Sequence, residues 1–197
     1  MSMIRRRTRI AIMVAIGVVL VMAVGARFLL WGGDHGISTS IGGPFTLVNG
    51  QGRTVTDADF RGKFMLIYFG YTYCPDVCPT SLGIIAGAYD KLSKSERERI
   101  QPIFITVDPE RDTPEVVGNY ASAFTPTMIG LTGSEAQIAA VAKAYKVYAA
   151  KAKNPDGGYS VDHSSIVYLM GPDGHFLAHF AHGVTVDQMV EGLRKQL

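Results

Sequence analysis

The sequence predicts an α/β domain preceded by one transmembrane helix. Short apolar segments alternate along the chain with segments whose apolar residues recur every three to four positions, as strands and helices do. Late in the chain, two apolar runs flank the turn Gly171-Pro172-Asp173-Gly174 and predict an antiparallel hairpin. With 197 residues, 47% of them hydrophobic, the chain has room for one domain and a short extra segment.

The N-terminus predicts a membrane anchor. An uncharged run of 17 residues, Ile10 to Ala26, follows four arginines, and Phe28 and Trp31 continue its apolar character. Because arginines flanking a span stay in the cytoplasm, we expect a single pass through the inner (cytoplasmic) membrane and a soluble domain in the periplasm. A cleaved signal peptide ending near Ala26 is the alternative. The expected layout is residues 1–31 as basic segment and anchor, 32–43 as flexible linker and 44–197 as folded domain.

Charge excludes nucleic acid as a partner. The formal net charge is +2, but five arginines lie in the first 31 residues, and the rest of the chain has 14 basic against 17 acidic residues. A domain with a net charge of −3 and no basic cluster lacks the means to neutralise phosphates.

The folded region begins with a hairpin and continues with alternating strands and helices. A short hairpin is expected around the Asn49-Gly50 turn. Thr113, Pro114 and Glu115 supply an N-cap, a first-turn proline and a first-turn acid. The expected strands are 45–48, 53–56, 64–69, 103–107, 128–131, 166–170 and 176–181, and the expected helices are 80–92, one opening at 114, 134–147 and 186–197.

This order of elements predicts a mostly parallel sheet with an antiparallel edge. It is compatible with a thioredoxin-like fold that carries an N-terminal β-hairpin extension. Ligands of open α/β sheets bind at the carboxyl ends of strands, and Cys74 comes directly after the strand 64–69.

The only two cysteines of the chain, Cys74 and Cys78, are four positions apart where a helix begins. This spacing puts both sulfurs on one side of a helix, and a helix N-terminus is expected to lower the pKa of a thiol. Two such thiolates are suited to Cu(I), or to zinc if further ligands join them. They can also form a disulfide.

The alternative to a metal-binding pair is an ordinary structural disulfide, because exported cysteines usually pair. A bridge enclosing so few residues would stabilise the fold little. The spacing also differs from the Cys-x-x-Cys of simple redox motifs.

The chain has five histidines that could supply a third metal ligand, and His163 has the best position. It lies immediately before the strand 166–170, in a loop that would face the cysteines of a thioredoxin-like fold, and Asp162 or nearby backbone could orient its ring. The remaining histidines lie in the predicted linker or around the late hairpin: His35, His175, His179 and His182.

Other candidate ligands have simpler explanations. Asp108 follows a strand and could lie near the site, although helix capping and surface charge explain most of its segment. The thioethers of Met65, Met128 and Met170 could bind copper, but their places in predicted strands favour core packing.

With these residues in hand, the chain resembles the Sco/SenC family of copper chaperones of cytochrome c oxidase assembly over roughly residues 44 to 197. The resemblance rests on three motifs in the family's order: Phe69 to Pro79, Val107 to Glu115 and Asp162-His163-Ser164. It implies one copper ion, as Cu(I) and also Cu(II), held by Cys74, Cys78 and His163. It also implies delivery of copper to the dinuclear copper site of the oxidase subunit, or reduction of that site's cysteines. Further partners would be other copper carriers, thiol oxidoreductases and the membrane.

Three other functions use the same residues. In an exported thiol-disulfide oxidoreductase, Cys74 and Cys78 are the redox pair and copper is incidental. A thiol peroxidase would need one activated cysteine with hydroxyl support, for which Thr72 is nearby. A copper-sensing module would bind the metal without transferring it.

Overall fold

The computed structural model describes residues 17, 22, 41–155 and 157–197. The predicted transmembrane segment, apart from Gly17 and Met22, and most of the predicted linker lie outside these residues. Among the residues described, no helix is both long and apolar enough to cross a membrane. The last residues of the predicted linker lie against the domain, where Gly42 donates a backbone hydrogen bond of 3.0 Å to the carbonyl of Ala144.

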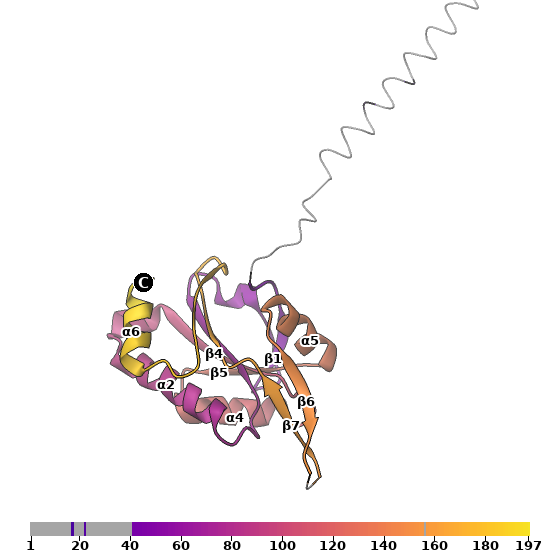
Figure 1. Cartoon of the computed structure of the whole chain (residues 1–197). Coiled ribbons are helices and arrows are strands. Elements are labelled where there is room, and N and C mark those ends of the chain that lie inside the picture. The colour runs from indigo at the N-terminus through magenta and orange to yellow at the C-terminus, as the bar shows by residue number, and fades with distance from the viewer. Residues whose placement is uncertain (1–16, 18–21, 23–40, 156) are drawn as a thin grey trace, which may run out of the picture. The chain divides into compact units, whose positions relative to one another are not determined.

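A seven-stranded sheet forms the centre of the domain, with the strand order β2-β1-β5-β4-β3-β8-β9 (Figure 1). Its strands are β1 (Thr46–Asn49), β2 (Thr54–Thr56), β3 (Phe64–Gly70), β4 (Ile100–Thr106), β5 (Ile129–Thr132), β8 (Val167–Met170) and β9 (Phe176–Phe180). Two further strands, β6 (Ala149–Lys153) and β7 (Tyr159–His163), form a separate two-stranded antiparallel sheet, here called the histidine hairpin.

Helices cover both faces of the main sheet. They are the 3-10 helix η1 (Asp57–Phe60) and the α-helices α2 (Val77–Lys91), α3 (Lys94–Glu98), α4 (Pro114–Phe124), α5 (Glu135–Ala144) and α6 (Val186–Arg194). Because crossovers between parallel strands are right-handed, the connections from β3 to β4 and from β4 to β5 place α2 and α4 on the same face. Helix α6 packs against α2 on that face, and α5 lies on the opposite side (Figure 1).

The sheet is less parallel than predicted. Among the described strands, the β3–β4 and β4–β5 pairings are parallel, whereas β1–β2, β1–β5, β3–β8 and β8–β9 are antiparallel. The N-terminal hairpin does not stand apart as an extension, because β1 pairs with β5 and continues the main sheet. The sequence shows which strands are joined by crossovers, but not which edge a hairpin joins.

Most predicted elements are present with shifted ends. The turn after Asn49 joins two antiparallel strands as predicted, and Thr113 caps α4 by accepting the backbone N–H of Val116. Helix α2 begins at Val77 rather than Thr80, and α5 ends at Ala144 rather than at residue 147. The sequence does not predict the histidine hairpin, because Ala149–Lys153 contains only alanine and lysine and lacks β-branched residues.

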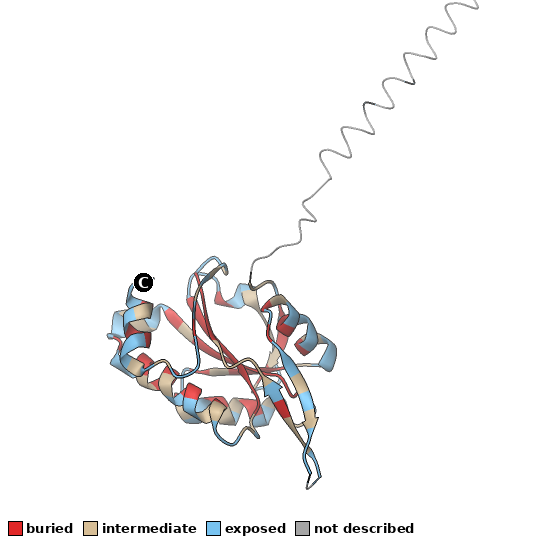
Figure 2. Ribbon diagram, in the orientation of Figure 1, coloured by how far each residue is buried: buried red, intermediate tan, exposed pale blue. Residues whose placement is uncertain are grey.

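The core lies between the main sheet and its helices, and it leaves the histidine hairpin largely outside. All seven residues of β3 are buried, as expected for a strand covered on both faces. Figure 2 shows buried residues concentrated in the central strands, whereas β6 and β7 are mostly intermediate or exposed.

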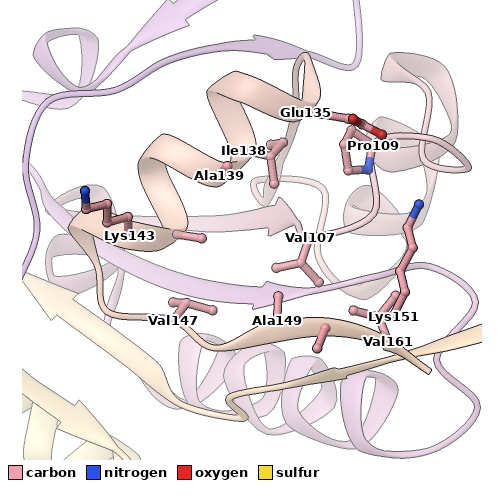
Figure 3. Close-up of a pocket in the computed structure, with 12 residues that line it drawn as sticks. Val107, Pro109, Glu135, Ile138, Ala139, Lys143, Val147, Ala149, Lys151 and Val161 are labelled. Atoms are coloured by element: carbon pink, nitrogen blue, oxygen red, sulfur yellow. The ribbon is translucent and has the colours of Figure 1, made fainter.

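A pocket of about 420 Å³ lies between α5 and β6. Apolar side chains including Ile138, Val107 and Val161 line it, with Lys143 and Lys151 among the charged residues of its lining (Figure 3). Neither cysteine lines this pocket, so it is separate from the site predicted from the sequence.

Candidate metal centre

The two cysteines lie where β3 gives way to α2, as predicted. Cys74 precedes the helix and Cys78 is in its first turn. The N-cap residue Asp76 makes no side-chain capping hydrogen bond. Instead, the backbone N–H of Cys78 donates to the sulfur of Cys74 over 3.4 Å. The sulfur of Cys74 therefore serves as an acceptor at the start of the helix, a position that a polar side chain usually fills.

Gly70 at the end of β3 makes room for the second cysteine. A Cβ atom built at this position would lie 2.7 Å from the sulfur of Cys78, a distance that real Cβ atoms do not show. Cys78 is fully buried, whereas Cys74 is partly exposed. Both are free thiols in the structure.

Burial overturns, for Cys78, the expectation that the helix start would lower the pKa of the thiol. Burial raises the pKa of Cys78 to about 12, and the neighbouring Cys74 adds to the increase. Because desolvation penalises the charged form, it outweighs the favourable helix terminus at this position. Cys78 is thus protonated at neutral pH in the free protein, and a metal that binds its thiolate must displace that proton.

His163 ends β7 and turns its ring toward the cysteines. It is the last residue of a strand, paired with Ala149, and not part of a loop as predicted. Its Nε2 lies 3.3 Å from the sulfur of Cys78, and its Nδ1 lies 3.1 Å from the carbonyl oxygen of Ser164. Because a carbonyl only accepts hydrogen bonds, Nδ1 carries the proton and Nε2 presents its lone pair to the cysteine. The expectation that nearby backbone orients this ring is confirmed.

Two tyrosines hold the imidazole edge to face. The ring centroids of Tyr71 and Tyr68 lie 5.8 Å and 6.2 Å from that of His163, at interplanar angles of 88° and 80°. Burial lowers the pKa of His163 from its usual 6.5, while Ser164 and Asp162 act in the opposite direction. The ring is therefore neutral at pH 7, which is the form that binds metals. No local sequence pattern predicts the role of these two tyrosines, although Tyr71 lies within the motif Phe69 to Pro79.

These three residues form a metal-binding geometry. The sulfurs of Cys74 and Cys78 and a ring nitrogen of His163 all lie within 4.8 Å of one another. Bonds of roughly 2.0–2.3 Å from a metal to sulfur and nitrogen place three trigonal ligands about 3.5–4 Å apart. The donors thus need only small movements to close around one ion, and two sulfurs with one imidazole suit a soft metal.

The remaining sequence candidates do not join this group. His175, His179 and His182 are exposed and lie outside it, and His35 is not among the described residues. The three candidate methionines are buried in the core, as the sequence favoured: Met65, Met128 and Met170.

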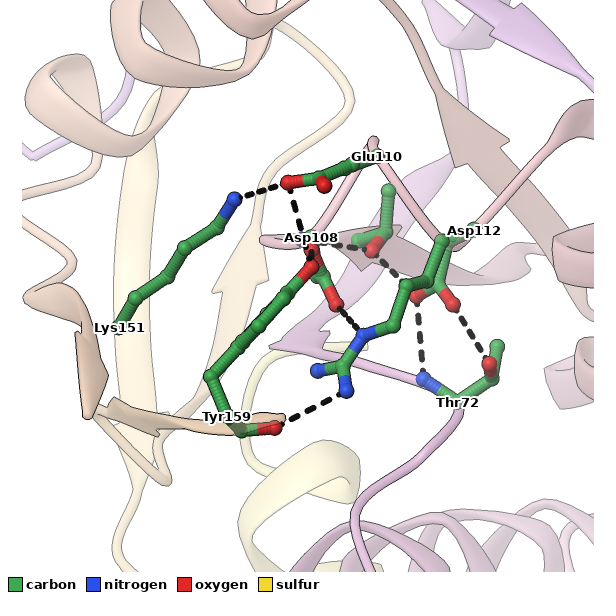
Figure 4. Close-up of polar contacts among 8 residues, drawn as sticks. Thr72, Asp108, Glu110, Asp112, Lys151 and Tyr159 are labelled. Carbon is green, nitrogen blue, oxygen red and sulfur yellow. Dashed lines mark hydrogen bonds and ion pairs between the residues drawn. The ribbon is translucent and has the colours of Figure 1, made fainter. Parts of the chain in front are cut away.

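A polar network that includes Asp108 and Asp112 begins at Thr72, two residues before Cys74 (Figure 4). Asp112 accepts hydrogen bonds from the backbone N–H and the hydroxyl of Thr72, at 3.0 Å and 2.5 Å, and from the hydroxyl of Thr106 at 2.5 Å. Asp108 accepts from Tyr159 at 2.9 Å and is paired with the Nε of Arg111. Asp108 and Asp112 are fully buried, so the interpretation of this segment as surface charge is wrong for both.

The family profile described as SCO1/SenC matches residues 34–197. The chain belongs to the SCO1/SenC family. Among curated relatives, the mitochondrial protein SCO1 homolog 1 of Arabidopsis thaliana is 42% identical over 158 residues. The match covers 80% of this chain and 47% of that relative, and the chain spans about half the length of the first curated relatives it matches.

Solved structures of the family have the same fold. Arabidopsis thaliana ScoI with copper bound has a TM-score of 0.75 and 42% identity, covering 80% of this chain and 98% of that chain. Bradyrhizobium japonicum ScoI with copper bound has a TM-score of 0.73 and 45% identity, covering 80% and 100%. BsSco, described as having a disulfide switch and as a member of the Sco family of cytochrome c oxidase assembly proteins, has a TM-score of 0.63 and 29% identity, covering 80% and 94%.

These similarities confirm the family resemblance and the mixed α/β, thioredoxin-like fold predicted from the sequence.

Proposed function

We propose that this chain is a copper chaperone that binds one copper ion through Cys74, Cys78 and His163. It delivers this cargo to the dinuclear copper site of cytochrome c oxidase. The observation that carries the proposal is the convergence of two sulfurs and one imidazole nitrogen within 4.8 Å. The copper-bound structures of two relatives with 42% and 45% identity support copper as the metal.

The geometry suits a carrier in which one ligand faces outward. Cys78, in the first turn of α2, is buried against the end of β3, whereas Cys74 is partly exposed and can meet the ligands of another protein. Copper passes on when a partner's thiolates replace these ligands one at a time, starting at Cys74. The neutral imidazole of His163 completes the set without adding charge, and it binds more weakly than a thiolate to soft copper, which favours release.

The proposal extends to partners, drawn from the family resemblance, and to location, drawn from the N-terminal sequence. The acceptor is the copper-binding subunit of the oxidase, with other copper carriers or thiol oxidoreductases acting before this chain. Residues 1–31 anchor the chain in the inner membrane, residues 32–43 form the linker, and the domain from residue 44 lies in the periplasm. The uncharged run 10–26 and the four arginines before it support this arrangement.

Anaerobic titration of the reduced full chain with Cu(I), against a competing chelator, tests the metal centre. We expect one tightly bound ion, a loss of affinity of at least ~1000-fold in Cys78→Ser, and a loss of ~100-fold in His163→Ala. His175→Ala is the matched control, because this exposed histidine lies outside the ligand group and its loss should leave the affinity unchanged. Binding that is indifferent to His163 would contradict the three-ligand site.

A thiol-disulfide oxidoreductase is the second candidate, favoured by two free thiols close enough to pair and by the disulfide switch described for BsSco. The thiolate of Cys74 would attack a partner disulfide and release one partner thiolate. Cys78 would lose its proton, attack the sulfur of Cys74 and release the second, so that two electrons pass to the partner and Cys74 and Cys78 become disulfide-bonded. This activity would survive His163→Ala, whereas tight copper binding would not.

A further inference from the structure

The histidine hairpin contributes a metal ligand but does not belong to the main sheet. Its two strands pair with each other over five residue pairs, from Ala149 with His163 to Lys153 with Tyr159. A two-stranded hairpin alone is at best marginally stable in water. Because His163 ends this hairpin, its distance from the cysteines depends on the side chains that fasten the hairpin to the domain.

Those side chains converge on the loop after β4. Tyr159 opens β7, and its hydroxyl donates to Asp108 over 2.9 Å. The Nη1 of Arg111 donates to the backbone carbonyl of Tyr159 over 3.0 Å. The Arg111 guanidinium also lies over the Tyr159 ring, with its carbon 3.9 Å from the ring centroid. Lys151 of β6 forms an ion pair with Glu110, so both strands are held from one short loop.

The same arginine faces the segment that carries the cysteines. Its guanidinium carbon lies 4.9 Å from the ring centroid of Tyr73 and 5.6 Å from that of Tyr71. Tyr73 directly precedes Cys74, and the ring of Tyr71 packs against the imidazole of His163. Arg111 therefore lies between the residues that position the cysteines and the residues that position the histidine.

The loop after β4, which carries Arg111, is held rigidly by buried hydrogen bonds. The carboxylate of Asp108 is fully buried and pairs with the Nε of Arg111, which fixes the plane of the guanidinium. The backbone N–H of Asp108 donates to the hydroxyl of Thr106 at the end of β4, and Asp112 bonds both Thr106 and Thr72. Figure 4 shows this chain of contacts running from Thr72 to Tyr159 and Lys151.

We propose that Arg111 is a positioning residue of the metal centre, which joins the histidine hairpin to the cysteine segment and thereby sets the place of His163. The inference rests on the proposed function for its effect on copper. Lysine cannot replace this arginine, because an ammonium group cannot pair with Asp108, bond the Tyr159 carbonyl and stack on three tyrosine rings at once. Residues that orient metal ligands typically account for about 10–100-fold in affinity.

The first test is a double-mutant cycle on copper affinity, measured by chelator competition with the full chain. Arg111→Lys should weaken binding ~10-fold in the unmodified chain and have no further effect in His163→Ala, because it acts through that ligand. Arg194→Lys is the matched control. It alters the ion pair between Arg194 of α6 and Glu96 of α3, which has no contact with the metal centre. An equal loss in both backgrounds, or no loss, would overturn the inference.

The second test needs no copper and separates this inference from the proposed function. In the reduced, metal-free chain, hydrogen exchange of the backbone amides in β7 and of Ser164 should be ~10-fold faster in Arg111→Lys, with β3 unchanged. Tyr159→Phe, which removes only the hydroxyl bonded to Asp108, should show a smaller change in the same amides. Unchanged exchange of β7 in Arg111→Lys would refute the positioning role, whether or not the unmodified chain binds copper.

Discussion

The two sides of the candidate metal centre are built differently. Cys74 and Cys78 follow a strand whose seven residues are all buried, and they open a helix of 15 residues packed on the main sheet. His163 ends a two-stranded hairpin in which exposed and partly exposed residues alternate along β6, and Val161 is the one buried residue of β7. Backbone pairing and core packing hold the cysteines, whereas side-chain contacts of Tyr159 and Lys151 hold the histidine hairpin.

In the proposed carrier role, this difference allows firm binding on one side of the centre and release on the other. The cysteine side of the centre, Cys74 and Cys78, can move only if the core of the domain is disturbed. The packing of the fold therefore sets its geometry. The histidine side can shift without exposing much apolar surface, because little of the hairpin is buried. Changes to the two sides should therefore have different consequences for stability and for binding.

The largest effect is expected from a cavity beneath the cysteines. Leu82 lies one helical turn after Cys78 and is fully buried. Leu82→Ala should lower the free energy of unfolding by about 2–5 kcal/mol, measured by urea denaturation of the metal-free chain. Leu177→Ala is the matched control, because this leucine on β9 is 39% exposed and its truncation should cost far less. Similar losses for the two variants would show that the helix under the cysteines is not firmly packed.

A smaller effect is expected where β3 meets Cys78. Gly70→Ala would place a methyl group 2.7 Å from the sulfur of Cys78 and should cost about 1–3 kcal/mol of stability. It should also weaken copper binding, because the sulfur has to move. Gly83→Ala, on the exposed side of α2 with no atom near its added methyl group, should leave the stability the same or raise it by up to ~1 kcal/mol. Copper titration and denaturation of both variants test this, and unaltered binding by Gly70→Ala would contradict it.

The smallest effect is expected from protonation of the histidine side. Burial lowers the pKa of His163 below 6.5, so between its folded and unfolded pKa values the unfolded chain binds more protons. The contribution of His163 to stability is therefore fully present above pH 6.5 and decreases as the pH falls through this window. Below the folded pKa, this histidine causes no further decrease.

The pH dependence has a direct readout. A nuclear magnetic resonance titration of the reduced, metal-free chain should give His163 a midpoint below 6.5, and His163→Gln should remove its share of the stability loss between that midpoint and pH 6.5. A midpoint at or above 6.5 would show that the ring is not desolvated as the structure places it.

The sequence predicts the cysteine side well because its signals are local. A continuous apolar run predicts β3, and the spacing of Cys74 and Cys78 at a helix start predicts two neighbouring sulfurs. It predicts the acidity of Cys78 wrongly, because the depth of burial depends on Gly70 and on the packing of α2, which no local pattern reports.

The histidine side is less predictable because its contacts are distant in the sequence. His163 is found through its place before β8 and through the family resemblance, but the hairpin that carries it has a weak strand pattern. Arg111 contacts Tyr159, 48 residues away, and the segment around it resembles a helix cap with surface charge. Only the tertiary structure shows that Asp108 and Asp112 are buried and connect the two sides of the centre.

The hydrogen bond from the Cys78 amide to the Cys74 sulfur gives α2 an internal reporter. The electron pairs of that sulfur are shared between the first turn of the helix and whatever else binds there, whether a metal, a second sulfur or a proton. Each of these changes the strength of the hydrogen bond, so the resonance position of a single backbone proton records the chemical state of the centre. Occupancy and oxidation can thus be followed in the intact protein without a label or an acceptor.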